Sequence, residues 1–294
     1  PHKGTTIDGN PVIQTPGSLL YVDGTRVAPA NWSNTFSTIQ AAHNAAVSGR
    51  GDIIFIAPGT YSENVVITKN KLSLIAAVQS GNSKRVVVSA STGKALDVSQ
   101  VTSFYAKGIS FYAAAADAVV TDSEGSLFED CDFRSDTGSG IVFFADTNNS
   151  FTGSGTTIYR SLIRECVSAV GALLLKKGGP TASDPGYGLQ ATNVNIWENQ
   201  FYGNTGPDIA DDGGTENPTY FHQWDISGNK FMTKDKATYL DMDTGNAGGT
   251  DCLISGNWFN DAALDLTNAI KLPTNGQLAG NFAKGGVGAI INAV

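Results

Sequence analysis

The chain has 294 residues, of which 41% are apolar and only 16% are charged, and its formal net charge is −8. This length and composition suit a single elongated domain with a sizeable apolar core. Lysine and arginine total only 19 and form no basic stripe, so we expect no nucleic-acid partner. The sequence has no apolar run of about 18 residues, and we therefore expect no membrane insertion.

Residues 1–30 are predicted to form an extended N-terminal arm. Pro11, Pro16 and Pro29, together with scattered glycines, interrupt regular structure in this segment. The polar sequence that follows Pro1 does not resemble a secretory signal peptide. We therefore expect synthesis in a host cytoplasm, with secretion as the alternative.

A short helix is predicted at about residues 34–48, at the start of a domain that covers residues 31–294. Asn34 or Thr35 can cap the helix, and Gly49 can end it. Its apolar stripe consists of Phe36, Ile39, Ala42, Ala46 and Val47. We expect this helix to cover one open end of the strands that follow, where unpaired backbone groups would otherwise invite aggregation.

From Gly51 onward the sequence predicts many short strands, and a small pattern recurs among them. It consists of an apolar residue, two others, then Asn or Cys, one more residue and usually Phe. The anchor positions are Cys131, Cys166, Asn199, Asn229, Asn257 and Asn281, which are 35, 33, 30, 28 and 24 residues apart. Self-similarity at this spacing is typical of stacked repeats. Because each copy has strand character, we interpret it as one coil of a parallel β-helix; an antiparallel sandwich is the alternative.

The anchors suit a bend that every coil repeats. Asn tolerates left-handed backbone geometry, and equivalent Asn side chains stacked about 4.8 Å apart can hydrogen-bond one another. The Phe two residues later returns to the interior, so Phe201, Phe231 and Phe259 are predicted to stack. The three cysteines fall at inward positions, and we expect buried free thiols. A disulfide between Cys131 and Cys166, on adjacent coils, stays open.

The predicted helix, the strand-rich segment from Asp52 to Ile67 and the segment Lys71-Leu72-Ser73-Leu74-Ile75 resemble the N-terminal end of the pectin-lyase-like superfamily. This resemblance implies an all-β fold, a right-handed single-stranded parallel β-helix with an N-terminal capping helix. It does not imply an activity, because the fold hosts lyases, hydrolases, esterases, epimerases and non-catalytic virus spikes.

Catalytic and metal-binding residues can be sought within this resemblance. Gly59 to Glu63 match a Gly-x-Tyr-x-Glu motif of pectin methylesterases, but the other motifs of that site are not recognised here. Asp211 and Asp212 echo the Asp pair of polygalacturonase-like hydrolases, and two carboxylates can supply an acid and a base. Carboxylates that flank Cys131 could bind calcium if the chain is an enzyme. No other cofactor or metal is expected.

Aromatic and apolar side chains point to surface contacts. Trp197, Tyr202 and Tyr220 could form a sugar-stacking face or a subunit interface. The last ten residues are apolar and glycine-rich, and Ile290, Ile291 and Val294 are predicted to make assembly contacts. We therefore expect a homo-oligomer, most simply a trimer.

Three classes of function remain. The residues favour a non-enzymatic structural protein of a virus or phage particle, such as a capsid decoration or spike, located in the virion. The alternatives are a polysaccharide-cleaving enzyme, such as a tail-spike depolymerase or a secreted lyase, and a bacterial surface module that binds carbohydrate without chemistry.

Overall fold

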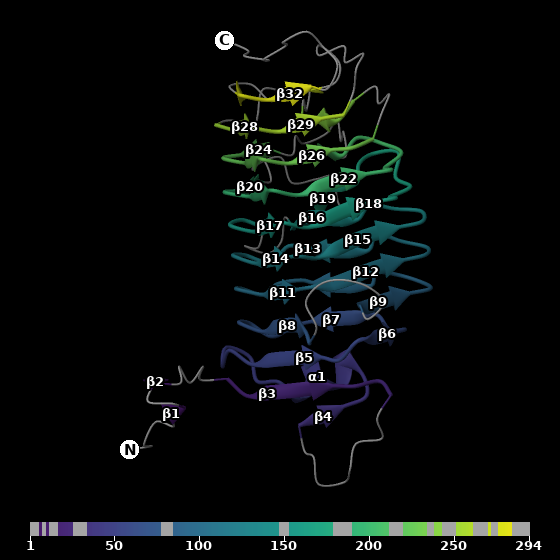
Figure 1. The fold of residues 1–294 in the computed structure, drawn as a ribbon, viewed down its shortest axis with the longest axis vertical. Coiled ribbons are helices and arrows are strands. Elements are labelled where there is room, and N and C mark those ends of the chain that lie inside the picture. Colours follow the sequence, from purple (N-terminus) through teal and green to yellow (C-terminus); the bar gives the residue numbers. More distant parts are fainter. Residues whose placement is uncertain are drawn as a thin grey trace.

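The computed structural model describes residues 6–7, 10–11, 17–25, 34–77, 85–146, 153–178, 190–211, 220–233, 238–242, 251–260, 270–271 and 276–283. Short strands in this part of the chain stack into three long parallel sheets (Figure 1). From Ile53 to Lys271 each turn of the chain contributes one strand to each sheet and then continues to the next level. The result is a parallel β-helix, as the repeat predicted, and the alternative of an antiparallel sandwich is wrong.

The eleven-stranded sheet contains, in spatial order, β31 (Gln277–Ala279), β28 (Leu253–Ser255), β25 (Asp225–Ser227), β21 (Asn195–Trp197), β17 (Thr157–Tyr159), β14 (Leu127–Glu129), β11 (Tyr105–Lys107), β8 (Ser73–Ala76), β5 (Ile53–Ile56), β3 (Leu19–Val22) and β4 (Thr35–Phe36). The nine-stranded sheet contains β32 (Phe282–Ala283), β29 (Trp258–Phe259), β26 (Lys230–Phe231), β22 (Gln200–Tyr202), β18 (Leu162–Arg164), β15 (Asp132–Ser135), β12 (Ile109–Ala113), β9 (Val86–Ala90) and β6 (Gly59–Tyr61).

The eight-stranded sheet contains β30 (Ile270–Lys271), β27 (Leu240–Asp241), β23 (Ile209–Asp211), β19 (Leu173–Gly178), β16 (Ile141–Asp146), β13 (Val119–Thr121), β10 (Leu96–Val98) and β7 (Val65–Ile67). A separate parallel pair is formed by β20 (Gln190–Thr192) and β24 (Tyr220–His222), and an antiparallel pair by β1 (Thr6–Ile7) and β2 (Asn10–Pro11). The one helix among the described residues is α1 (Ile39–Ala45), and none of them forms a helix with the length and apolarity needed to cross a membrane.

Alternating burial explains the strands. In β9 and β12 every second side chain is buried, as the period of two in a strand requires. The inward side chains form one continuous apolar column along the stack. Within it the rings of Phe201 and Phe231 stack with centroids 4.9 Å apart, and those of Phe231 and Phe259 with centroids 4.7 Å apart. The predicted Phe stack is confirmed.

The bend between the eleven-stranded and nine-stranded sheets carries a ladder of buried asparagines. Asn229 is fully buried, and its Oδ1 accepts from the backbone N–H of Asn199 (2.8 Å) and from its Nδ2 (3.1 Å). The same two bonds link Asn229 to Asn257 and Asn257 to Asn281. Each of these Asn Nδ2 groups also donates to a backbone carbonyl on the preceding coil. The predicted ladder is therefore confirmed.

Two details of this bend differ from the prediction. Ser161, and not Cys166, continues the ladder, because the N–H of Ser161 donates to Asn199 Oδ1 and the N–H of Cys131 donates to Ser161 Oγ. Cys166 belongs to a second bend, where its N–H donates to Asn204 Oδ1. The left-handed residue precedes each anchor: φ lies between 48° and 69° at Asp130, Arg160, Glu198, Gly228, Gly256 and Gly280. The Asn side chain therefore serves the ladder and not the backbone angle.

The N-terminal region is more regular than predicted. Leu19–Val22, within the expected arm, form β3, which pairs with β5 and buries Leu20 and Val22. Alternation of apolar residues outweighs the flanking prolines here. Helix α1 is shorter than residues 34–48, because Thr35–Phe36 pair with β3 and Thr38 is the N-cap, whose side chain accepts from the N–H of Ala41. The helix packs against β3, β4, β5 and β7, and its role as a cap on the stack stays a prediction.

The three cysteines are free and buried, as expected, and Cys131 and Cys166 are not bridged. Burial raises the pKa of Cys131 and of Cys166 to about 12, and that of Cys252 to about 11. All three are therefore protonated thiols at neutral pH, and they act as small apolar side chains of the core.

Candidate functional site

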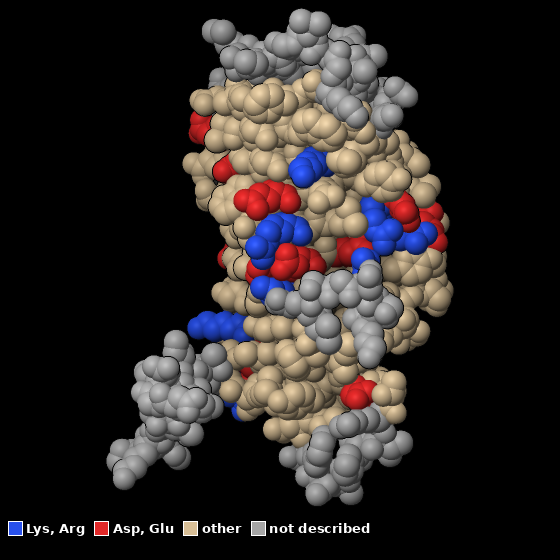
Figure 2. All heavy atoms as spheres, in the orientation of Figure 1, with Lys and Arg blue, Asp and Glu red and all other residues tan. Residues whose placement is uncertain are grey.

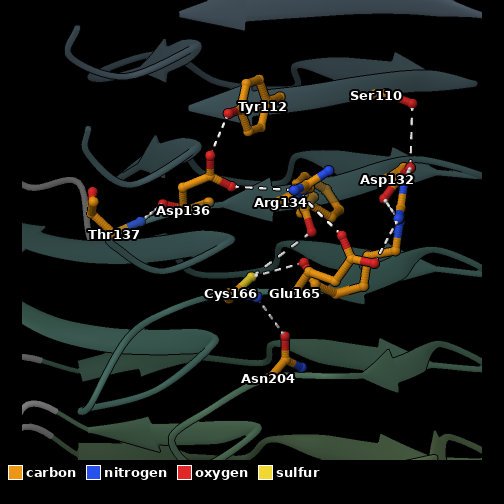
Figure 3. Close-up of polar contacts among 12 residues, drawn as sticks. Ser110, Tyr112, Asp132, Arg134, Asp136, Thr137, Glu165, Cys166 and Asn204 are labelled. Atoms are coloured by element: carbon orange, nitrogen blue, oxygen red, sulfur yellow. Dashed lines mark hydrogen bonds and ion pairs between the residues drawn. The ribbon is translucent and has the colours of Figure 1, made fainter. Parts of the chain in front are cut away.

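The outward face of the nine-stranded sheet carries a charged patch, which we define as Asp132, Arg134, Asp136, Arg164 and Glu165 (Figures 2 and 3). Alternation places these side chains outside, because Phe133, Ser135 and Ile163 between them point into the core. The Nε and Nη2 atoms of Arg164 donate to the two oxygens of Asp132, each at 3.0 Å. This bidentate geometry is the strong form of an arginine–carboxylate pair.

The other members of the charged patch are paired in the same way. Arg134 lies 3.4 Å from Asp136 and 3.2 Å from Glu165, which also lies 3.3 Å from Arg164. Tyr112 on β12 donates to Asp136, and the guanidinium of Arg134 lies 5.3 Å from the centroid of its ring (Figure 3). Every carboxylate of the charged patch is therefore paired with at least one guanidinium of the same patch.

A second set of charges lies on the outward face of the eleven-stranded sheet. Glu129 accepts from Tyr105 (2.5 Å), Lys107 (2.9 Å) and Arg160 (2.6 Å), so that three coils meet at one carboxylate. The hydrogen bond from Tyr105 and then that from Lys107 lower the pKa of Glu129, although partial burial opposes them. Burial and the bond to Glu129 raise the pKa of Tyr105. Both groups therefore keep their ordinary charge states at neutral pH.

This arrangement bears on the proposed calcium site near Cys131. The bend at Asp130 and Cys131 directs Glu129 to the eleven-stranded sheet and Asp132 to the nine-stranded sheet. Asp130 is bound instead by Arg160, at 3.2 Å. Within the described ranges, no three His, Cys, Asp or Glu side chains are grouped so that they could hold a metal ion. The carboxylates that are adjacent in sequence are thus separated by the fold.

Next to this second set lies an open hollow of about 810 Å³ on the same sheet. It extends across β14, β17, β21 and β25 and includes Tyr159 and Trp197, which are register partners on adjacent strands. Trp197 is 37% exposed. Glu198 and Asp225 are the carboxylates of the lining. The hollow thus combines an aromatic surface with hydrogen-bond acceptors.

No protein-family model and no curated protein sequence matches the chain. Among solved structures, the chain is similar to pectate lyase Pel9A, at 15% identity and a TM-score of 0.58, over 94% of this chain and 78% of that one. It is also similar to ORF18 of Geobacillus virus E2, at 13% identity and a TM-score of 0.56, over 91% of this chain and 58% of that one.

The chain has the pectin-lyase-like parallel β-helix fold. At these identities the likeness establishes the fold alone. The chain spans less than two thirds of the length of the viral protein. Both a polysaccharide-active enzyme and a viral protein share the architecture, so the fold does not decide between the function classes.

The Gly-x-Tyr-x-Glu segment of this β-helix has a structural role. The carboxylate of Glu63 accepts from the backbone N–H groups of Ile39 (2.8 Å) and Gln40 (3.0 Å), at the N-terminus of α1. The hydroxyl of Tyr61 donates to the carbonyl of Ala57 at 2.7 Å. The motif therefore ties the helix to the stack, since a carboxylate at a helix N-terminus satisfies free N–H groups and the helix dipole.

The predicted catalytic pair is only partly within the described residues. Asp211 ends β23, is half-buried and is the register partner of Leu175 on the eight-stranded sheet. Asp212 lies outside the described residues. Asp241 on β27 is in the same sheet and pairs with Lys271 at 2.9 Å. The catalytic role of Asp211 and Asp212 stays a prediction.

Two of the three aromatic candidates, Trp197 and Tyr202, lie on different sheets. Trp197 lies on the eleven-stranded sheet, whereas Tyr202, which is 52% exposed, lies on the nine-stranded sheet beyond the Asn199 bend. The backbone of Tyr220 is in β24, and its side chain is outside the described set. Ile290, Ile291 and Val294 also lie outside the described residues. Sequence reasoning missed Tyr159, whose signal was its place opposite Trp197 in the repeat.

Proposed function

We propose that this chain is a structural β-helix protein of a virus or phage particle, a decoration or spike that assembles as a homo-oligomer, most simply a trimer. The observation that carries the proposal is that the outward carboxylates of two clusters form ion pairs. In the charged patch and around Glu129, each carboxylate is bound by arginine or lysine, mostly from other coils. Such pairs between coils suit a rigid outer wall more than they suit acid–base chemistry.

Two further features support this proposal. The core column and the Asn ladder make the stack a rigid rod, which is the mechanical requirement for a projection or a surface layer. A virus protein, ORF18 of Geobacillus virus E2, has the same architecture, although at 13% identity this supports the fold only. The location in the virion is part of the proposal.

A polysaccharide-cleaving enzyme is the second candidate, and one observation favours it. Glu198 and Asp225 line the hollow on the eleven-stranded sheet beside Trp197. Two carboxylates next to an aromatic side chain are the minimal equipment for cleavage of a glycosidic bond. Asp211, on another sheet, is not required for this candidate.

The two candidates are separated by activity and by location. The recombinant chain is incubated with pectin, polygalacturonate, alginate and neutral polysaccharides, with and without calcium, while unsaturated uronates, reducing ends and methanol are measured. We expect no product above that of the Glu198→Gln, Asp225→Asn double variant. Antibodies against the chain should label purified particles of the encoding virus in electron micrographs, and light scattering should give the mass of an oligomer. Enzymatic turnover, or particles that lack the chain, would overturn the proposal.

A further inference from the structure

The hollow on the eleven-stranded sheet owes its space to two glycines in a column of left-handed residues. This column precedes the first inward residue of successive coils, and its φ angles lie between 55° and 69°. Its members are Lys71, Ser103, Gly125, Gly155, Asn193, Gln223 and Asp251. Backbone hydrogen bonds link the levels of Ser103, Gly125, Gly155 and Asn193 in that order.

Glycine is the least strained residue at the positive φ of positions 125 and 155, but other coils carry a side chain in the same geometry. Five other members of the column adopt the same left-handed φ with a side chain present. A Cβ at Gly125 would meet no atom within 4 Å, and one at Gly155 would meet Gly125 only at an ordinary contact distance of 3.6 Å. Because both glycines line the hollow, the missing side chains leave it open along this edge.

The dimensions of the hollow suit an extended ligand. It crosses four adjacent strands, from β14 to β25, and strands lie about 4.8 Å apart, so its length is roughly 14 Å. Each of these strands is three residues long and contributes one or two side chains to the lining, so the width is at most roughly 10 Å. The long direction follows the axis of the stack, where the rigid ladder holds the strands in register.

The side chains in the hollow define the chemistry of the ligand. Trp197 is partly exposed in the hollow, and an indole ring can stack against the apolar C–H side of a sugar ring. Tyr159 is the adjacent aromatic, and the guanidinium of Arg160 lies 4.6 Å from its ring centroid and fixes it in place. Asp225, Ser227 and Ser255 are hydrogen-bonded to one another at the edge, so sugar hydroxyls would meet both donors and acceptors.

The charge of the residues that line the hollow favours uncharged over acidic glycans. The described residues that line the hollow include the carboxylates Glu198 and Asp225, and no lysine or arginine is among them. Arg160, which lies next to the lining, is already bound by Glu129 and Asp130. A uronic-acid polymer would therefore meet two like charges on a chain whose net charge is −8.

We propose that this hollow is a binding site for an uncharged polysaccharide segment, which stacks on Trp197 and hydrogen-bonds to Glu198 and Asp225. The site requires no cleavage, so it is compatible with a particle protein that attaches to a cell-surface glycan. It stands on its own geometry and does not depend on the proposed location in the virion.

Affinity electrophoresis and isothermal titration calorimetry of the full chain test this site, with mannan, galactomannan and dextran as neutral probes and polygalacturonate as the charged probe. We expect binding to at least one neutral probe and at least tenfold weaker binding to polygalacturonate. Trp197→Ala should lose at least tenfold in affinity. Tyr202→Ala, which removes a more exposed aromatic from the other sheet, is the matched control and should bind as the parent does.

A second variant keeps the indole and fills the space. Gly155→Asn places the residue type of Asn193 at the neighbouring position of the column, where Asn tolerates the left-handed angle. Because a side chain at this angle carries some strain, the melting temperature should fall slightly while the chain stays folded, and affinity should fall at least tenfold. The proposal is overturned by no binding to any neutral probe, by stronger binding to polygalacturonate, or by parent-like affinity in Trp197→Ala or in a folded Gly155→Asn. Cleavage of a probe would refute the structural function proposed above and leave the binding site intact.

Discussion

Replacement of Asn229 by alanine tests the ladder that holds the coils together. The side chain of Asn229 makes four hydrogen bonds, to the carbonyl of Ile196, to Asn257 Oδ1, and to the N–H and Nδ2 groups of Asn199. The variant removes the partners of the Asn199 N–H and of the Ile196 carbonyl, whereas Asn199 Nδ2 still donates to Ile158 and Asn257 Oδ1 still accepts from the N–H of residue 229. At about 1–3 kcal/mol for each of the two buried groups that lose their bond, the free energy of unfolding should fall by about 2–6 kcal/mol.

Unfolding in guanidinium chloride, monitored by tryptophan fluorescence, measures the total loss in the free energy of unfolding. Hydrogen exchange gives the local readout, because a stacked repeat protein need not unfold in one step. The N–H of Asn199 should exchange much faster in Asn229→Ala, whereas that of Asn257, which donates to Asn281, should keep most of its protection. Asn195→Ala, at a partly exposed Asn with one bond to Thr157, is the matched control and should cost less than about 1 kcal/mol. Equal losses in the two variants would refute the ladder as a source of stability.

Three further predictions concern the helix and the thiols. Glu63→Gln should lower the free energy of unfolding by about 1 kcal/mol, because the negative charge at the N-terminus of α1 is lost. Thermal melting measures this loss, and an unchanged melting temperature would contradict the anchoring role of Glu63. Burial lowers the pKa of His43, so the unfolded chain binds its proton more tightly, and stability should be complete above about pH 6.5 and fall as the pH decreases below it. The same series with His43→Gln should lack this component, and identical pH profiles would contradict it. The thiols should resist iodoacetamide at pH 8 in the native chain and react in denaturant, and rapid native labelling, read by mass spectrometry, would contradict the burial of Cys131, Cys166 and Cys252.

The interior of this protein is predictable from its sequence because each coil repeats the same requirement. An inward apolar residue, an Asn at the bend and a Phe two residues later must recur wherever a coil stacks on the next. The prediction failed where the ladder substitutes another residue: Ser161 takes the Asn position by accepting from Cys131, and no apolar pattern reveals a serine in that role. Cys166 then resembles an anchor, although it serves a second bend.

Which charged side chains meet at the surface is determined by the fold and not by their distance in the sequence. Asp132 and Arg164 are 32 residues apart and meet because their strands are adjacent in the nine-stranded sheet. Glu129 and Asp132 are close in sequence and lie on different sheets. Charged residues that look like a cluster in the sequence are thus dispersed, and a paired network arises from residues that look unrelated.

This division between core and surface explains how such a fold can gain a site without loss of stability. The inward column and the Asn ladder set the register of every strand, so outward side chains and bend residues can change while the backbone stays the same. In the left-handed column, Gly125 and Gly155 occupy positions where the other coils carry side chains, and the backbone angles are alike. Both glycines line the hollow beside Tyr159 and Trp197. Function in a stacked fold is then set by which outward positions of adjacent coils come into register, and this can be determined only once the register itself is known.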